Sequence, residues 1–158
     1  MSTKLIKPKK ISKKEIVSLP KTQAKVGRYY EAVGRRKTAV ARVRVFPGGP
    51  RESGVPEVFV NEKPLSAYFV KKQGNVVLSP FKELSLDGHK VSAKVYGGGK
   101  NAQAEAIRLG ISRALIDLNN VWRSRLKRAG FLRRDPRMVE RKKYGLRKAR
   151  RPQQWRKR

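Results

Sequence analysis

The chain has 158 residues, which is room for one modest domain rather than two. Lysine and arginine number 41 against 11 acidic residues, so the formal net charge is +30, which indicates a polyanionic partner such as nucleic acid. The absence of cysteine excludes disulfides and thiolate chemistry, and no apolar run reaches the roughly 18 residues that a membrane-spanning helix needs.

The charge is spread unevenly along the chain. Residues 1–27 hold eight lysines and one glutamate, residues 28–120 hold 16 basic and 8 acidic residues, and residues 121–158 hold 17 basic and 2 acidic residues. The middle therefore has the charge balance of an ordinary soluble domain, and both ends are basic arms. We predict a basic, disordered N-terminal extension over residues 1–28, a folded domain over residues 29–135 and a basic tail over residues 136–158.

Strand patterns open the predicted domain. Small and apolar residues alternate from Ala39 to Phe46 while Arg42 and Arg44 take the other face, which predicts a half-buried strand with a basic outer face. A turn follows at residues 47–50. The next patterns predict, in chain order, a strand at 58–60, a helical stretch at 65–69, a strand at 75–78, a hairpin turn at Asp87-Gly88 and a strand at 91–95.

A glycine run, Gly97–Gly99, ends the last of these strands, and a long helix follows. Apolar residues recur at spacings of four, four and three between Ile107 and Leu118, so they form one stripe on that helix. Small residues at 106, 110 and 114 run beside the stripe. Glycine in a helix costs about 1 kcal/mol relative to alanine, so Gly110 predicts tight packing of the helix against a sheet.

The remaining signals complete the predicted domain. Asn119 or Asn120 can cap a further helix that Gly130 would end, and Asp135-Pro136 would start one more helical turn. Apolar residues suffice for one core. The fold class we predict is α+β, with two layers: a mixed β-sheet and helices on one face of it, plus extended basic arms at both ends.

The C-terminal arm carries the strongest functional signal. Residues 141–158 contain ten lysines or arginines and no acid, which is typical of an arm that threads into folded RNA. Tyr144 and Trp155 are interleaved aromatics that could stack on bases. The alternative is a solvated tail or a localisation signal, but a targeting cluster needs only about five to eight residues.

The glycine run also suggests a phosphate site, because Lys100 follows it at the start of a helix. The nucleotide-binding pattern fails, since Lys94 stands where the first glycine belongs and Asn101 where serine or threonine belongs. A tight turn with positive φ explains the run at least as well, and an RNA backbone is the better phosphate ligand.

Nothing in the sequence supports catalysis. His89 is the single histidine and lies beside a predicted turn, and no carboxylates are paired at a spacing suited to acid–base chemistry. We therefore expect no enzyme activity, cofactor, metal, small-molecule substrate or membrane partner. The N-terminus lacks the apolar core of a secretory signal, so a cytoplasmic location is expected, with an organelle less favoured.

Three long segments resemble a known family. Residues 29–43 run Tyr-Tyr-Glu-Ala-Val-Gly-Arg-Arg-Lys-Thr-Ala-Val-Ala-Arg-Val, residues 97–115 join the glycine run to a helix with Gln103 and Arg108, and residues 126–151 are rich in arginine and lysine. Together they are similar, in order over residues 29–158, to the family of the ninth protein of the small ribosomal subunit in its bacterial and organellar form. Residues 1–28 are extra, and the family commonly ends Phe-Ser-Lys-Arg where this chain ends Trp-Arg-Lys-Arg.

The resemblance implies a structural ribosomal protein. Its domain would be similar to the second domain of the fifth small-subunit protein and would lie in the head of the subunit on 16S-type rRNA, beside other head proteins. The tail would pass through the RNA toward the peptidyl-site tRNA. The family's rRNA-binding positions fall on Arg35, Arg36, Lys37, Arg141, Lys142, Lys143, Arg147, Lys148, Arg150 and Arg151, to which the patterns above add Arg42, Arg44 and Lys100. The tRNA-proximal positions are Arg156, Lys157 and Arg158.

Two other hypotheses remain open at this point. A free RNA- or DNA-binding module, such as an RNA chaperone, fits the composition equally well. A nucleotide-binding enzyme would rest on the glycine run alone.

Overall fold

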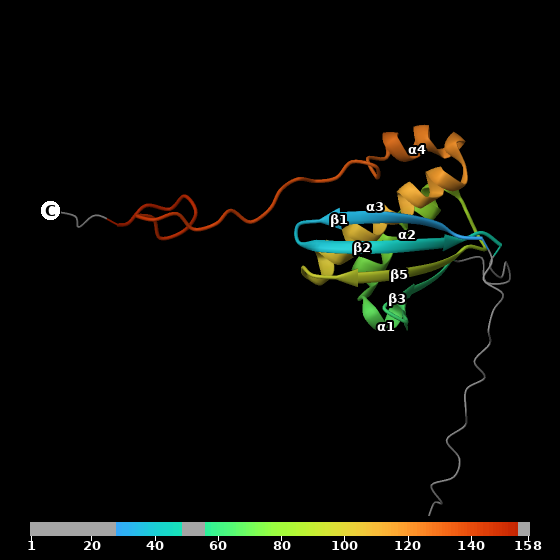
Figure 1. Cartoon of the computed structure of the whole chain (residues 1–158), viewed down its shortest axis with the longest axis horizontal. Helices are drawn as coiled ribbons and strands as arrows, with labels where there is room; N and C mark the ends of the chain where they lie inside the picture. The colour runs from blue at the N-terminus through green and yellow to red at the C-terminus, as the bar shows by residue number, and fades with distance from the viewer. Residues whose placement is uncertain (1–27, 49–55, 155–158) are drawn as a thin grey trace, which may run out of the picture.

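The computed structural model describes residues 28–48 and 56–154. Figure 1 shows these residues as a folded domain from which a long C-terminal segment departs. Several of the predicted features lie outside the described residues: the N-terminal extension up to residue 27, half of the turn at 47–50, Trp155, and the tRNA-proximal residues Arg156, Lys157 and Arg158.

Five strands in the described part of the chain form one sheet, in the order β1-β2-β5-β3-β4. The pair β3–β5 is parallel and the other neighbours are antiparallel, so the sheet is mixed as predicted. The strands are β1 (Tyr30–Arg36), β2 (Ala39–Phe46), β3 (Glu57–Val60), β4 (Lys63–Pro64) and β5 (Lys90–Tyr96).

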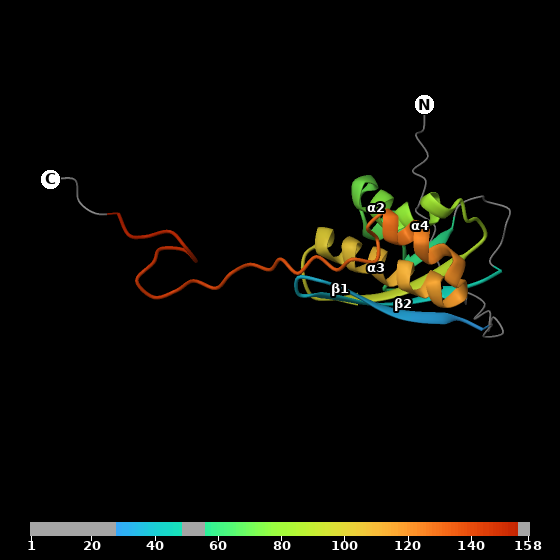
Figure 2. The same ribbon diagram turned by 90° about the horizontal axis from the view of Figure 1, so that it is seen from above.

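The helices cover one face of this sheet, which confirms the predicted two-layer α+β fold. Figure 2 shows them together on one side, with the strands forming the opposite layer. None of the helices in residues 28–48 and 56–154 lies on the other face of the sheet. The helices are α1 (Leu65–Tyr68), α2 (Lys71–Leu84), α3 (Lys100–Leu118), a 3₁₀ turn (Asn120–Trp122) and α4 (Arg123–Arg128).

The core lies between the sheet and α3, and its packing is as tight as the small residues predict. The inward residues of β2 alternate as expected, and Ala39, Ala41, Val43 and Val45 are fully buried. A Cβ added to Gly34 of β1 would lie 1.8 Å from the carbonyl oxygen of Ala106, and one added to Gly110 would lie 2.6 Å from Cγ2 of Val43. Backbone therefore meets backbone where β1 crosses α3.

The strand predicted at residues 75–78 is wrong, because these residues belong to α2. The buried positions of α2 include Gly74, Val77, Phe81 and Leu84, a spacing of three and four that only a helix brings to one face. Pro80 lies inside this helix and has no N–H for the carbonyl of Val76. The Ser79 hydroxyl donates to that carbonyl at 2.8 Å, so the carbonyl still has a hydrogen-bond donor.

The predicted hairpin turn at Asp87-Gly88 is wrong for the same reason. This turn joins the end of α2 to β5, and Gly88 has a φ of +70° there. The strand that follows, β5, is confirmed, with Val91, Ala93 and Val95 facing the core.

The end of the domain follows the predictions up to Gly130 and departs from them afterwards. The Asn119 side chain accepts the N–H of Val121 at 3.1 Å, and Gly130 has a φ of +76° just beyond α4. The helical turn predicted at Asp135-Pro136 is wrong, because residues 133–143 have no regular structure. The Asp135 carboxylate is used by ion pairs instead of by a helix cap.

Candidate nucleic-acid interface

The tail presents most of its cations to solvent. Residues 133–143 run out of the domain past the end of the sheet where β1 turns into β2, as Figures 1 and 2 show. From residue 136 to residue 154, the part of the tail that the structure describes, six exposed cations have no ion pair. They are Arg141, Lys142, Lys143, Arg147, Lys148 and Arg151.

Farther along, the tail folds back on itself. A single β-bridge joins Leu146 to Pro152, and the N–H of Arg147 donates to the carbonyl of Arg151 at 2.8 Å. The guanidinium of Arg150 pairs with the carboxylate of Glu140, whose pKa this hydrogen bond lowers. Residues 140–152 thus form a loop with one internal ion pair and free cations around it, a feature that the sequence patterns did not predict.

Aromatic and apolar side chains of the tail are also unprotected. Tyr144 is 100% exposed, and Met138 and Val139 are largely exposed as well. Contact with water does not stabilise large apolar side chains, so their burial against a partner would be favourable. The exposed aromatic ring is available for stacking on a base.

Arg36 has a different environment from the one expected of an RNA-binding cation. Its side chain is only 11% exposed and points toward α3 and the start of the tail. The Arg36 guanidinium pairs with the Glu105 carboxylate of α3, donates to the carbonyl of Arg137 at 2.7 Å, and lies 2.9 Å from Oδ2 of Asp135. All of its charge is engaged inside the protein.

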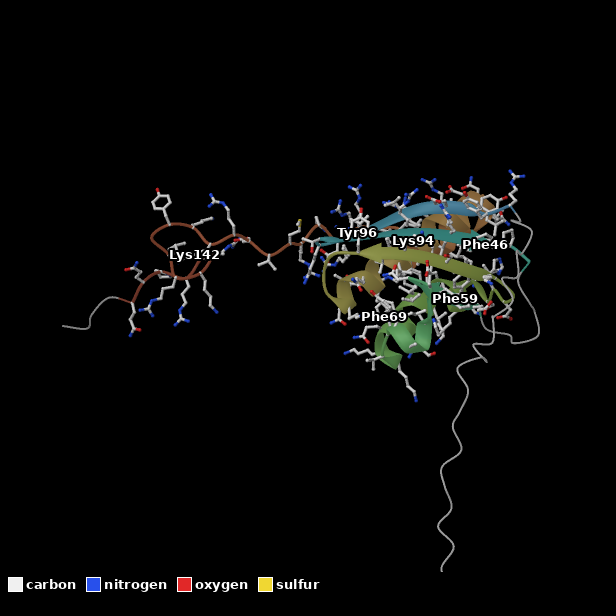
Figure 3. The ribbon with its side chains drawn as sticks, turned by 60° about the horizontal axis from the view of Figure 1, so that its bottom comes forward. Phe46, Phe59, Phe69, Lys94, Tyr96 and Lys142 are labelled. Carbon is white, nitrogen blue, oxygen red and sulfur yellow. The ribbon has the colours of Figure 1, made fainter. Side chains whose placement is uncertain are left out.

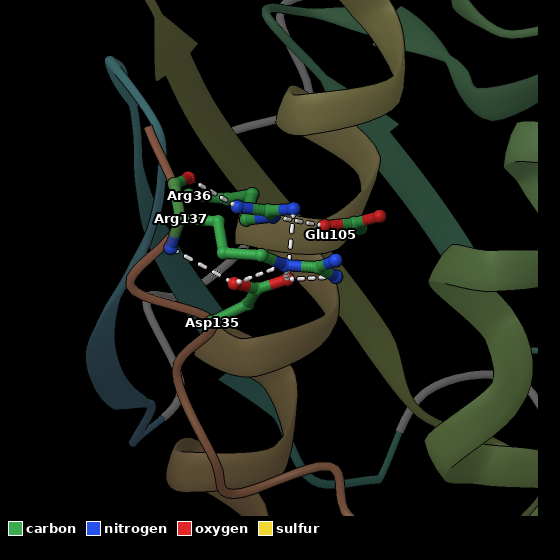
Figure 4. A network of polar contacts seen from close by, with 4 residues as sticks. All are labelled: Arg36, Glu105, Asp135 and Arg137. Carbon is green, nitrogen blue, oxygen red and sulfur yellow. Dashed lines mark hydrogen bonds and ion pairs between the residues drawn. The ribbon is translucent and has the colours of Figure 1, made fainter. Parts of the chain in front are cut away.

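Arg137 closes this network, which Figure 4 shows. Its Nη2 lies 2.8 Å from Oδ2 of Asp135, and its backbone N–H donates to Oδ1 of the same carboxylate at 2.9 Å. The hydrogen bonds from Arg137, with the charge of Arg36 nearby, hold the pKa of Asp135 far below its ordinary value. We call Arg36, Glu105, Asp135 and Arg137 the tail clasp, because it joins β1, α3 and the first residues of the tail.

The neighbours of Arg36 point outward, as expected. Arg35 is exposed on the helix-free face of the sheet, and Lys37 is exposed in the β1–β2 turn with a φ of +51°. The predicted basic outer face of β2 is also present. Both guanidinium groups there, on Arg42 and Arg44, contact Glu31 of β1 and lower the pKa of its carboxyl, Arg44 more than Arg42.

Lys100 points away from the sheet. Its Nζ lies 3.4 Å from the centre of the Tyr68 ring, a cation–π contact on the helix side of the domain. Gly97 and Gly98 both have positive φ, and a Cβ on Gly97 would lie 2.6 Å from the carbonyl oxygen of Thr38. Close passage of the chain beside the β1–β2 turn therefore accounts for the glycines.

Two features of the surface were missed by the sequence patterns. Lys94 and Tyr96 of β5 join the cations of β1 and β2 on the helix-free face, since outward residues of neighbouring strands stand side by side. The alternation of β5 contained this signal for Lys94. The tail clasp had no sequence signal, because its hydrogen bond from Arg36 to Arg137 joins positions 101 residues apart.

The described residues offer little for chemistry. An open cleft of about 700 Å³ beside β3 is lined mainly by apolar side chains of α1, α2 and the link between them, including Leu65, Phe69 and Leu78. Within residues 28–48 and 56–154 there is no group of three histidine, aspartate or glutamate side chains placed to hold a metal ion. Among the same residues, none of the helices has the length and apolarity required to cross a membrane.

An α+β domain with its helices on one face of the sheet, and with a tail whose cations are mostly unpaired, is typical of basic proteins that bind a polyanion. Residues 34–158 match the family described as ribosomal protein S9/S16, and the chain belongs to this family. It is 51% identical over 131 residues to the small ribosomal subunit protein uS9 of Arthrobacter sp. (strain FB24), covering 80% of this chain and 74% of that protein. The protein of the same name from Renibacterium salmoninarum is 50% identical over the same lengths. The resemblance found in the sequence is confirmed.

Proposed function

We propose that the protein is a structural constituent of the small ribosomal subunit in the cytoplasm, where it binds rRNA through its tail and part of its sheet. Membership of the ribosomal S9/S16 family, together with the row of unpaired cations on the tail, is the observation that supports this most strongly. The role is electrostatic and positional, so it needs no catalytic group, cofactor or metal.

The tail is built for contact with a phosphate backbone. Its backbone has no regular structure over residues 133–143, so it can follow an irregular groove between RNA helices. Each phosphate that one of its cations neutralises releases a condensed counterion, and this release drives binding. Arginine makes up half of the six unpaired cations, and its planar fork suits two-point contact with phosphate.

Arg36 enters this proposal in a new role. The resemblance places it among the rRNA contacts, but its guanidinium is engaged by the tail clasp. It acts as a positioning residue, which fixes the direction in which the tail leaves the domain. Arg35 and Lys37 on either side of it remain exposed for RNA.

A set of charge substitutions tests the rRNA contact. In one variant Arg141, Lys142 and Lys143 become glutamine; the control changes Lys71, Lys72 and Lys82 of α2 in the same way. We measure binding to a bacterial 16S-type rRNA transcript at several salt concentrations. The slope of log affinity against log salt should fall by about two to three in the tail variant, at roughly 0.7–0.9 per lost phosphate contact, and by less than one in the control. Equal changes in the two variants would refute the tail contact.

The second part of the proposal is that the tail tip reaches the peptidyl-site tRNA. It rests on the family resemblance, because residues 156–158 lie outside the described part of the chain. Removing these three residues should leave incorporation into the subunit largely intact and weaken retention of peptidyl-site tRNA, since most phosphate contacts lie upstream. Unchanged tRNA retention would show that the tip has no such role.

A further inference from the structure

The helix-free face of the sheet carries its outward side chains in rows. Figure 3 looks onto the strands and labels Tyr96 and Lys94 of β5 and Phe46 of β2 along this face. The strand register fixes which residues stand side by side. The two rows nearest the β1–β2 turn are Arg35, Val40 and Tyr96, followed by Val33, Arg42 and Lys94. The two rows farther away are Glu31, Arg44, Ser92 and Phe59, followed by Phe46, Lys90 and Glu57.

Charge divides these rows into two unlike halves. The farther rows hold two cations and two carboxylates, and they are paired: Arg44 with Glu31 and, at 3.8 Å, Lys90 with Glu57. The rows nearest the turn hold three cations and no carboxylate. We call them the carboxylate-free half.

Two cations of the carboxylate-free half are uncompensated. Arg42 reaches across to Glu31, but Arg35 and Lys94 have no ion pair among the described residues. Like charges on one face repel each other, and a bound anion removes that cost. The chemistry that fits this half is therefore a pair of phosphates or another polyanion.

Tyr96 adds an aromatic surface to the same half. Its side chain is 63% exposed, and none of the described helices covers this face of the sheet. It stands two strands from Arg35, so about 10 Å separates their Cα atoms. Lys94 lies two residues away on the same strand, about 7 Å along it. Tyr96 thus has one free cation across the sheet and another along its own strand, an arrangement that suits a stacked base with phosphates of the same strand nearby.

The position of this half supports the same partner. Arg35 and Arg36 are consecutive, and while Arg35 faces outward from the sheet, Arg36 holds the start of the tail in the clasp. The carboxylate-free half and the root of the tail therefore lie at the same end of the domain (Figures 2 and 3). RNA that follows the tail toward the domain meets this part of the sheet next.

We propose that the carboxylate-free half is a second RNA contact, in which Tyr96 stacks on an unpaired base while Arg35 and Lys94 contact phosphates of the same strand. This inference rests on the proposed function, since it places the contact in the rRNA that the tail also binds. A protein surface is the competing occupant, and the free cations around the ring favour RNA over it.

Photocrosslinking identifies the occupant. Tyr96 is replaced by p-azidophenylalanine in the full-length chain, which is incorporated into small subunits, purified and irradiated. The matched control carries the same substitution at Phe59, which lies in the rows farther from the β1–β2 turn. We expect an adduct between position 96 and an rRNA nucleotide, with a weaker one from position 59. An adduct with a neighbouring protein, or no adduct, would overturn the inference. Provided that the chain is incorporated into small subunits, that result would not contradict the proposed function. Failure of the chain to enter subunits would refute both.

Substitutions measure the stacking and the charge separately, with the 16S-type transcript as the probe. Tyr96→Ala should weaken binding by about 5- to 150-fold, the range found for loss of one base–aromatic stack, and Tyr96→Phe should bind like the original chain. Lys94→Gln should reduce the salt slope by about 0.7 to 0.9, and Lys90→Gln should reduce it much less because Glu57 already pairs that lysine. Equal losses from Tyr96→Ala and Tyr96→Phe, or from the two lysine variants, would contradict the inference.

Discussion

At the residue scale, three consecutive cations at the end of β1 have three different environments. Arg35 is exposed on the sheet, Arg36 is engaged in the tail clasp, and Lys37 is exposed in the turn. Their side chains alternate between the two faces of the strand, so their neighbours differ although their chemistry is nearly the same. Charge alone therefore does not identify which of them contacts RNA.

Substitution at position 36 should cost far more stability than substitution at position 35. Arg36→Ala leaves the Glu105 carboxylate and the Arg137 carbonyl without their donor, which should lower the free energy of unfolding by about 1.5–3 kcal/mol. Arg35→Ala, at an exposed position, should change it by less than about 0.5 kcal/mol. Urea unfolding of both variants measures the difference. Similar small losses would show that the clasp does not hold the tail root to the domain.

The clasp should also resist acid. The folded-state pKa of Asp135 is lowered, mainly by hydrogen bonds from Arg137, so its contribution to stability is fully present above the unfolded value of about 3.9 and disappears as pH falls through the lower folded value. Carbon-13 NMR of the Asp135 carboxyl should give a midpoint well below 3.9 in the folded chain. Arg137→Gln should raise that midpoint. A midpoint near the ordinary value in the original chain would rule out the ion pairs of Figure 4.

At the scale of elements, the sequence predicted what depends on local periodicity and missed what depends on distant partners. β2 and α3 were predicted because their apolar residues repeat with the period of a strand and a helix. Part of α2 was predicted as a strand because Gly74 and Pro80 are residues that usually interrupt a helix. The Ser79 hydroxyl donates to the carbonyl that Pro80 leaves without an N–H, and this contact exists only in the folded helix. The turn expected at Asp135 is displaced by its ion pair with Arg36, far away in sequence.

The crossing of β1 over α3 gives a test of element packing. Gly34→Ala places a methyl group 1.8 Å from a backbone oxygen of α3, which no rotation can relieve, so the two elements must separate. We expect a loss of about 1–3 kcal/mol or more. Gly99→Ala is the control, since a Cβ there meets nothing within 4 Å and should change stability by less than about 1 kcal/mol. Thermal unfolding compares them, and equal stability of the two variants would argue against backbone contact at this crossing.

At the scale of the whole molecule, the folded domain and the tail differ in how their charges are paired. Among the described residues, acids of the domain pair with four of its cations, Arg36, Arg42, Arg44 and Lys90, and the tail keeps most of its cations free. Composition predicted this division, since residues 28–120 hold one acid for every two basic residues and residues 121–158 hold only two acids against 17 basic residues. It could not show which cations the fold engages, because pairing partners come together only in the tertiary structure.

The most direct test is sedimentation of a cell extract on a sucrose gradient, with this protein followed before and after a high-salt wash. A loosely bound translation factor serves as the marker that the wash should remove. We expect the protein to stay with the small subunit at one copy per particle, because the proposed contacts of the tail and the sheet would have to break together. Release by the wash, or spread among light fractions, would contradict an integral ribosomal role and favour a free RNA-binding module.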